Sequence, residues 1–283
     1  TLSTRNSLAQ IPFSEFTDRT TSNLIQRNGL MANAHYRLTP DWSAFVGLRA
    51  DRRDSQRARE SSDWRQDAWE AGFRYLPETG AMLSLLVRAA DGRYPTRSVF
   101  DASGNPLPVT VDNAYRQHDL LLRAQHAPSD KSRFGMELGL AERRFENLGQ
   151  RDFRGAVWLL DADWYPGGAW RISAAARREI GAAEMLTANY VDQRTLSLSA
   201  AWQVTGRLSV QGSIERYDRS FDGDPGFVLG LGPKRQDRTQ AAGVAVAWDV
   251  WRIARLTAGL RRERRESNVF SALYEADVFT LGI

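Results

Sequence analysis

The stretch from Trp42 to Ala50 reads WSAFVGLRA, and its apolar residues fall mainly on every second position. Trp, Ala, Val, Leu and Ala occupy the even positions, whereas Ser, Phe, Gly and Arg occupy the odd ones. A helix with about 3.6 residues per turn would scatter these side chains round its surface, but a pleated strand gathers them on one face. The stretch therefore predicts a β-strand with one apolar face.

The same alternation recurs along the chain between spaced turn signals. It returns in 195–203, 207–217 and 241–249. Turn signals near residues 40, 78, 128, 167, 206 and 251 follow one another at intervals of 38 to 50 residues. A hairpin of two strands of about 10–12 residues with one long loop fills about 40 residues, so short turns at one end and long polar loops at the other indicate an outer-membrane barrel.

We therefore predict an all-β fold: a transmembrane antiparallel up-and-down β-barrel of about 14 strands, with 12–18 as alternatives, in a single domain over residues 1–283. The strands are expected near 3–14, 25–38, 42–52, 64–76, 81–92, 114–126, 132–144, 152–165, 169–180, 190–203, 207–218, 238–249, 253–263 and 272–283. The long loops are expected at 52–64, 91–113, 144–151, 181–190, 218–238 and 262–270. A barrel must be secreted, so we expect a processed protein of the bacterial outer membrane whose signal peptide is removed.

Aromatic residues gather near the short turns. Six lie within a few residues of a turn on the apolar face: Trp42, Tyr75, Trp164, Trp170, Trp202 and Trp248. Amphipathic rings favour the headgroup layer, so we predict that these six form a membrane girdle at the periplasmic end. The alternative is packing at the rim of a soluble β-sandwich, which the repetition over several hairpins disfavours.

The polar positions of the strands are expected to line the lumen. The predicted pore-lining or substrate-path residues are Arg37, Arg49, Asp51, Glu70, Arg74, Arg88, Asp119, Arg123, Glu137, Arg143, Asp161, Asp163, Arg171, Arg177, Glu179, Glu215, Tyr217 and Arg261. Guanidinium groups pair with carboxylates and stack on flat faces, so this set favours a path for an anionic or hydroxyl-rich solute. In the alternative interpretation the charges pair with one another and brace the wall.

Arginine clusters lie at the long-loop ends of several strands, at 143–144, 177–178, 261–262 and 264–265. They favour contact with the phosphates of outer-membrane lipopolysaccharide or with an acidic glycan. A solvated charged rim is the alternative, because charge runs are often solvated.

The composition argues against several functions. The chain has 38 Lys+Arg against 34 Asp+Glu, a net charge of +4, so we expect no nucleic-acid partner. It has no cysteine, which excludes disulfides and thiol chemistry. The three histidines, His35, His118 and His126, are too dispersed for a metal site or a catalytic pair. We predict no enzyme activity, no metal and no cofactor.

Several segments resemble a known family. Residues 151–155 read RDFRG, and an alternating Trp-rich strand follows to Pro166. This pattern resembles the EpsL-like proteins, which are outer-membrane barrels of exopolysaccharide biosynthesis operons. The hairpin from Trp170 to Glu179 and the segment from Tyr274 to Gly282 are similar as well. The resemblance implies passage of a secreted polysaccharide across the outer membrane.

We therefore expect an outer-membrane channel for exopolysaccharide export, in contact with outer-membrane lipid, the secreted polysaccharide and periplasmic export components. A general or solute-specific uptake porin is the first alternative. A structural or adhesive barrel with a plugged lumen is the second. The segment 91–113, with Pro95, Pro106 and Pro108, is the longest candidate for a constriction loop folded into the lumen.

Overall fold

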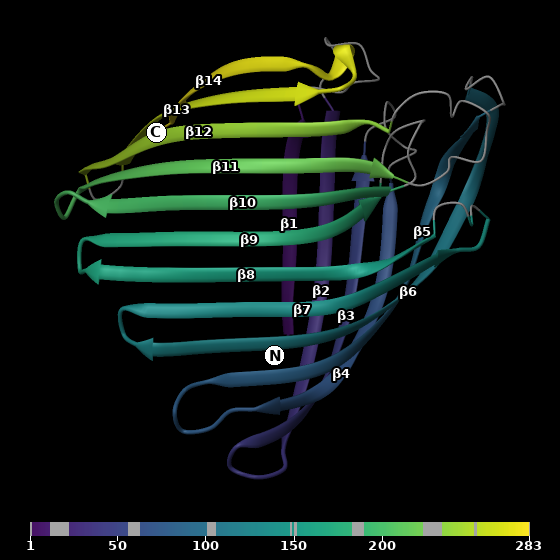
Figure 1. Ribbon diagram of the computed structural model, residues 1–283, viewed down its shortest axis with the longest axis horizontal. Coiled ribbons are helices and arrows are strands. Elements are labelled where there is room, and N and C mark those ends of the chain that lie inside the picture. Colours follow the sequence, from purple (N-terminus) through teal and green to yellow (C-terminus); the bar gives the residue numbers. More distant parts are fainter. Residues whose placement is uncertain are drawn as a thin grey trace.

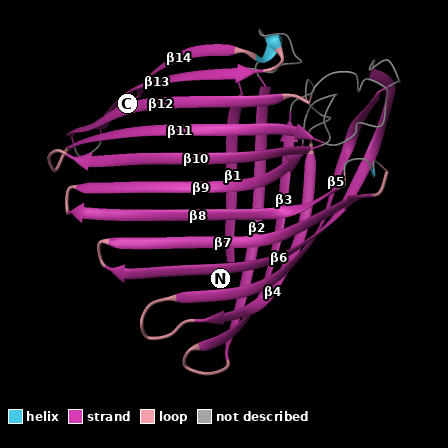
Figure 2. Cartoon of the chain, in the orientation of Figure 1, coloured by secondary structure: helices cyan, strands magenta, loops and turns pink. Residues whose placement is uncertain are grey.

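The computed structural model describes residues 2–11, 23–55, 63–100, 106–147, 149, 152–182, 190–222, 234–251 and 254–282. Within them, fourteen strands form one sheet in which each strand pairs with its neighbours in sequence (Figure 1). The strands are β1 (Leu2–Ile11), β2 (Asn23–Arg37), β3 (Trp42–Ser55), β4 (Trp64–Tyr75), β5 (Met82–Phe100), β6 (Pro106–Ser129), β7 (Ser132–Phe145), β8 (Phe153–Gly167), β9 (Trp170–Ala182), β10 (Tyr190–Gln203), β11 (Leu208–Asp222), β12 (Gln236–Trp251), β13 (Ala254–Ser267) and β14 (Tyr274–Gly282). A short 3₁₀ turn, η3 (Phe270–Ala272), precedes β14 (Figure 2).

The predicted meander of fourteen antiparallel strands is confirmed. Short connections lie where the turn signals predicted them, as at 38–41 between β2 and β3 and at 204–207 between β10 and β11. In the second, the Thr205 hydroxyl accepts a hydrogen bond from the Leu208 backbone N–H at 3.1 Å. No helix among the described residues is long and apolar enough to cross a membrane.

The prediction of a long loop at 91–113, the candidate constriction loop, is wrong for most of that segment. β5 continues to Phe100 and β6 begins at Pro106, so both strands extend past the ends of their neighbours (Figure 1). The register shifts between Tyr94 and Arg97, which allows the extended hairpin to accommodate Pro95 at an irregularity in the ladder. Residues 101–105 of the predicted loop lie outside the described residues.

Other predicted loops are also partly strand. β11 reaches Asp222, β12 begins at Gln236 and β13 reaches Ser267. The alternation of side chains simply continues past the apolar part of each strand with polar residues on both faces, so a rule based on apolar residues ends the strands too early. The predicted-loop residues 56–62, 183–189 and 223–233 lie outside the described residues.

The pairing register separates the sheet into two faces. Directly opposed residues of an antiparallel pair share a face. Leu48 opposes Trp69 on the convex, outer face, and both side chains are exposed. The concave, inner face carries the polar residues together with a small apolar core in which Phe45, Leu86 and Leu121 are buried and Val157 packs against them.

The sheet curls round on itself. In Figure 1, β1–β4 pass behind β8–β12 and run across them. The strand order begins at β1 and ends at β14, and no register joins these two strands within the described residues. β1 and β14 are therefore the edges of a curved wall.

Candidate functional site: the polar inner face

The register places all eighteen predicted lining residues on the inner face. Glu70 opposes Arg88, Arg88 opposes Asp119, and Arg123 opposes Glu137, so their side chains leave the sheet on the same side. The same alternation puts the other residues of the set on this face. Whether they line a solute path remains a prediction.

A ladder of polar contacts crosses the inner face from β4 to β7. Arg88 contacts the Glu70 carboxylate at 3.1 Å and the Asp119 carboxylate at 3.7 Å. The Gln117 amide donates to both oxygens of Asp119, at 2.9 and 3.0 Å, and its own oxygen accepts from Arg143 at 2.8 Å. Four neighbouring strands therefore share one connected network.

Aromatic rings extend this ladder toward the long-connection end of the strands. The Arg143 guanidinium lies 4.2 Å from the Tyr115 ring centroid and 5.4 Å from that of Phe153. The Trp64 indole N–H donates to the Tyr115 hydroxyl at 2.7 Å, and that hydroxyl donates to Gln66 at 3.1 Å. Phe153 belongs to the RDFRG segment, so one residue of that motif contributes to packing.

The sequence prediction omitted Tyr115, Gln117, Gln66 and Trp64. The register places them on the same face as Asp119 and Glu70. The alternation of side chains between the two faces could therefore have placed these four residues on the inner face. The prediction kept mainly charged residues and so left out most of the uncharged polar and aromatic ones.

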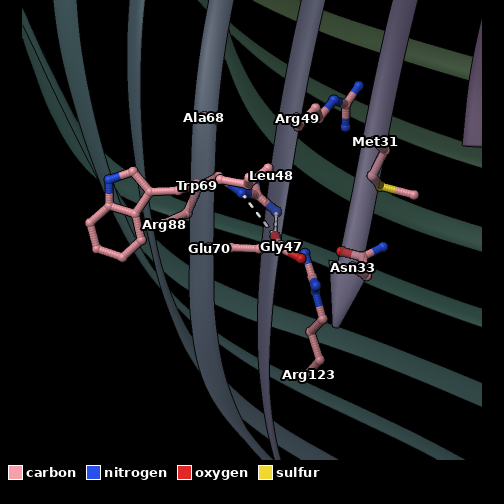
Figure 3. Close-up of a pocket in the computed structure, with 10 residues that line it drawn as sticks. All are labelled: Met31, Asn33, Gly47, Leu48, Arg49, Ala68, Trp69, Glu70, Arg88 and Arg123. Atoms are coloured by element: carbon pink, nitrogen blue, oxygen red, sulfur yellow. Dashed lines mark hydrogen bonds and ion pairs between the residues drawn. The ribbon is translucent and has the colours of Figure 1, made fainter. Parts of the chain in front are cut away.

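A hollow of about 150 Å³ lies beside the ladder (Figure 3). Glu70 projects into it, while Trp69 points away from it to the other side of the sheet. A Cβ at Gly47 would lie 2.5 Å from the Asn33 amide oxygen and 2.9 Å from Glu70 Cγ, so the absence of a side chain at Gly47 lets these two side chains lie across it.

Gly92 has a similar role beneath Tyr115. A Cβ there would lie 2.2 Å from the tyrosine ring, so we expect Gly92→Ala to displace the ring and destabilise the fold by about 1–3 kcal/mol. The control is Gly212→Ala, where a Cβ meets nothing within 4 Å. Urea unfolding in phospholipid vesicles measures both. Equal free energies of unfolding for the two variants would contradict this role of Gly92.

A second network lies on β11 and β13. The Glu215 carboxylate accepts from the Tyr217 hydroxyl at 2.7 Å and from Arg261 at 2.7 Å. Arg261 also approaches Glu263 at 3.5 Å. Three of the predicted residues, Glu215, Tyr217 and Arg261, are therefore in contact. Glu263, which the prediction did not include, joins them.

The remaining predicted charges form mostly local pairs. Arg49 pairs with Asp51, Arg123 with Glu137, Arg171 with Asp163, and Arg177 with Glu179. Arg74 lies 5.2 Å from the Phe45 ring centroid. Arg37 and Asp161 share the face with these residues but form no ion pair among the described residues. The wall is thus lined by charges of both signs that largely neutralise one another.

The six predicted girdle residues all lie on the outer face near the short connections. Trp42 opposes Tyr75, with ring centroids 4.9 Å apart. Trp170 stacks on Trp202 at 5.2 Å. Trp164 opposes Ile172, and Trp248 opposes Leu208. Their role at a membrane interface remains a prediction.

Among the described residues there is no group of three or more His, Cys, Asp or Glu side chains arranged to hold a metal ion. The charged clusters of the inner face combine carboxylates with arginines instead. Their chemistry is hydrogen bonding and ion pairing.

Comparison with known proteins identifies the fold. No family model and no curated protein matches the sequence. The structure is similar to the copper transporter OprC, with a TM-score of 0.58 and 9% identity over 92% of this chain and 50% of that one. It is also similar to the pyoverdine outer membrane receptor FpvA of Pseudomonas aeruginosa PAO1, with a TM-score of 0.57 and 9% identity over 97% of this chain and 51% of that one.

A third similar structure is the FrpB iron transporter of Neisseria meningitidis, with a TM-score of 0.51 and 9% identity over 89% of this chain and 45% of that one. The chain thus spans about half the length of the solved structures it matches. At these identities the likeness establishes the fold, which is that of an outer-membrane β-barrel wall.

Proposed function

We propose that this protein is a channel of the outer membrane that passes an exopolysaccharide across it, without enzyme activity. The observation that carries the proposal is the inner face, where carboxylates, guanidinium groups, amides and hydroxyls lie on strand after strand. The likeness of the fold to outer-membrane transporters and receptors supports a transport role and an outer-membrane location. The resemblance to EpsL-like proteins is the reason for choosing a polysaccharide.

The chemistry of the inner face suits a hydroxyl-rich polymer. Sugar hydroxyls both donate and accept hydrogen bonds, and the network between Glu70 and Arg143 offers acceptors and donors in alternation. Because these groups already pair with one another, a passing sugar exchanges one hydrogen bond for another at small net free energy. Many weak, exchangeable contacts allow a chain to slide.

A channel also requires that the wall close. Hydrocarbon offers no water to unpaired backbone N–H and C=O groups, so both edge strands need partners in a bilayer. β1 and β14 are separated by an even number of antiparallel strands and therefore run in opposite directions. This is the arrangement that antiparallel closure of β14 on β1 requires.

Deletion of the gene tests the proposal. We expect secreted polysaccharide to fall at least tenfold and glycan to accumulate in the periplasm, as measured by sugar analysis of medium and periplasm. Unchanged secretion with reduced uptake of small solutes would overturn export in favour of an uptake porin. Unchanged secretion and unchanged uptake would favour a structural barrel.

A matched pair of variants locates the path. Ser199 opposes Ser213 on the inner face, and Ala200 opposes Gly212 on the outer face of the same two strands. Tryptophan at both serines narrows the inner space, so secretion in the complemented deletion strain should fall at least twofold. Tryptophan at Ala200 and Gly212 places the same bulk outside and should leave secretion unchanged. Equal effects of the two pairs would count against passage along the inner face.

Uptake is the second candidate function. The similar structures are a copper transporter, an iron transporter and a pyoverdine receptor. The specific observation in its favour is the hollow beside Glu70, whose volume of about 150 Å³ has room for part of a small solute but not for a polymer chain.

A further inference from the structure

The outer face carries a row of arginines directly beyond its apolar part. On six consecutive strands, β8 to β13, the first charged outward residue after the apolar positions is an arginine: Arg154, Arg178, Arg194, Arg216, Arg238 and Arg262. We call this row the arginine belt. At the opposite end of the same face the outward positions hold Trp164, Trp170, Trp202 and Trp248. One face therefore has an aromatic end and a cationic end.

The pairing register places the two adjacent arginines of each cluster on opposite faces of the sheet. Arg177 opposes Thr195 on the inner face, whereas Arg178 opposes Arg194 on the outer face. The inner arginine belongs to the wall of the proposed channel, and the outer one belongs to the belt. The sequence prediction of arginine clusters at the rim is thus replaced by a belt on one face.

The centre of the belt lies at a hollow near the long-connection ends of β10–β13, which is lined by outward residues of the belt and also by Arg219, Asp237 and Ser267 of the inner face. Arg194 opposes Arg178 on one side and Asp218 on the other, and Asp218 opposes Arg238. Arg194, Arg216 and Arg238 line a hollow of about 630 Å³ at this position. Two arginines that face each other across a strand pair repel, and an anion between them relieves the repulsion.

On the outer face, four arginines at the centre of the belt lie beside two carboxylates: Arg178, Arg194, Arg216 and Arg238 beside Asp192 and Asp218. Arg178 pairs with Asp192 at 2.8 Å. Arg216 and Arg238 share the single carboxylate of Asp218, at 2.8 and 3.0 Å. Asp218 is therefore already occupied by two guanidinium groups.

Arg194 and Glu266 are the other outward charges that line the hollow. Arg194 is exposed and pairs with no carboxylate among the described residues. Glu266 also lines the hollow, but Arg264 matches it at 3.4 Å. On the outward side, the arginines around the hollow therefore exceed the carboxylates by two, whereas the inward Arg219 and Asp237 offset each other.

We propose that the belt, centred on Arg194, binds the phosphate groups of the glycolipid in the outer leaflet. Headgroup phosphates lie directly beyond the acyl chains, which is the level of the belt relative to the apolar positions. Guanidinium groups present paired N–H donors that match phosphate oxygens. Basic hollows on membrane proteins commonly bind anionic lipid headgroups. This site lies on the face opposite the proposed channel, so it stands independently of the transport proposal.

Binding of diphosphorylated lipid A to the purified protein in detergent tests this site. The double variant Arg194→Gln with Arg238→Gln should bind lipid A at least tenfold more weakly than the unmodified protein. Arg177→Gln is the matched control, because its side chain lies on the inner face and its loss should leave lipid A binding unchanged. Circular dichroism and the heat-dependent shift in gel mobility verify that each variant is folded.

Two further measurements distinguish lipid phosphate from free inorganic phosphate as the ligand. Dephosphorylated lipid A should bind at least tenfold more weakly than the phosphorylated form. Inorganic phosphate at millimolar concentration should displace little of the bound lipid A. Equal binding of the two lipids, an equal loss in Arg177→Gln, or full displacement by inorganic phosphate would each overturn the assignment.

Discussion

Arginine in place of Leu198 should strongly destabilise the protein in a bilayer, whereas arginine in place of its neighbour Ser197 should be tolerated. Leu198 lies on the outer face of β10, in the middle of the apolar positions from Leu196 to Trp202, and is exposed. Arginine on the lipid face at the bilayer midplane costs about 2–4 kcal/mol. The free energy of unfolding in phospholipid vesicles should fall by that amount.

Ser197 offers a control on the same strand. It opposes Glu215 on the inner face, where an added guanidinium meets a carboxylate and polar neighbours. We expect Ser197→Arg to change the free energy of unfolding by less than about 1 kcal/mol. A similar cost for both substitutions would mean that the outer face of β10 does not contact lipid, and the assignment of the two faces would then be wrong.

The strand order and the two faces could be predicted because a period of two is local information. WSAFVGLRA already fixes which side of β3 is apolar, and each short turn fixes the direction of the next strand. The strand ends could not be predicted in this way. Past Ala89, β5 carries Asp91 and Arg93 outward, so the outer face is no longer apolar. The strand itself nevertheless continues to Phe100.

The partners of the inner-face residues required the register. The alternation places Arg88 and Asp119 on the same face, but only the pairing of β5 with β6 sets them opposite each other. Asp161 and Asp163 share one face of β8, and Arg171 pairs with Asp163, a choice that the alternation alone does not determine. The roles of Gly47 and Gly92 could not be predicted from the sequence either, because they depend on side chains of other strands that lie across these glycines.

Arg88→Met should destabilise the protein by about 3 kcal/mol, because it leaves two inner-face carboxylates without their shared cation. Arg88 contacts both Glu70 and Asp119, and Asp119 is only 6% exposed. Replacing those acids as well, by Glu70→Gln and Asp119→Asn, removes the unpaired charges and should recover most of the loss. Urea unfolding in vesicles measures the single and the triple variant.

Arg116→Met is the matched control on the other face of β6. Its ion pair with Asp91 spans 3.5 Å, and both side chains are more than 70% exposed, so the pair contributes about 0–1 kcal/mol. Equal losses for Arg88→Met and Arg116→Met would show that the inner ladder does not hold the wall together.

The triple variant then separates bracing from transport. If the ladder only braces the wall, a strain that carries the stable triple variant secretes polysaccharide normally. If its charges also serve the passing polymer, as we propose, secretion falls at least twofold although the free energy of unfolding is restored. The two roles assigned to Arg88 are thereby measured on one protein, because stability reports the contacts within the wall and secretion reports the contacts with the solute.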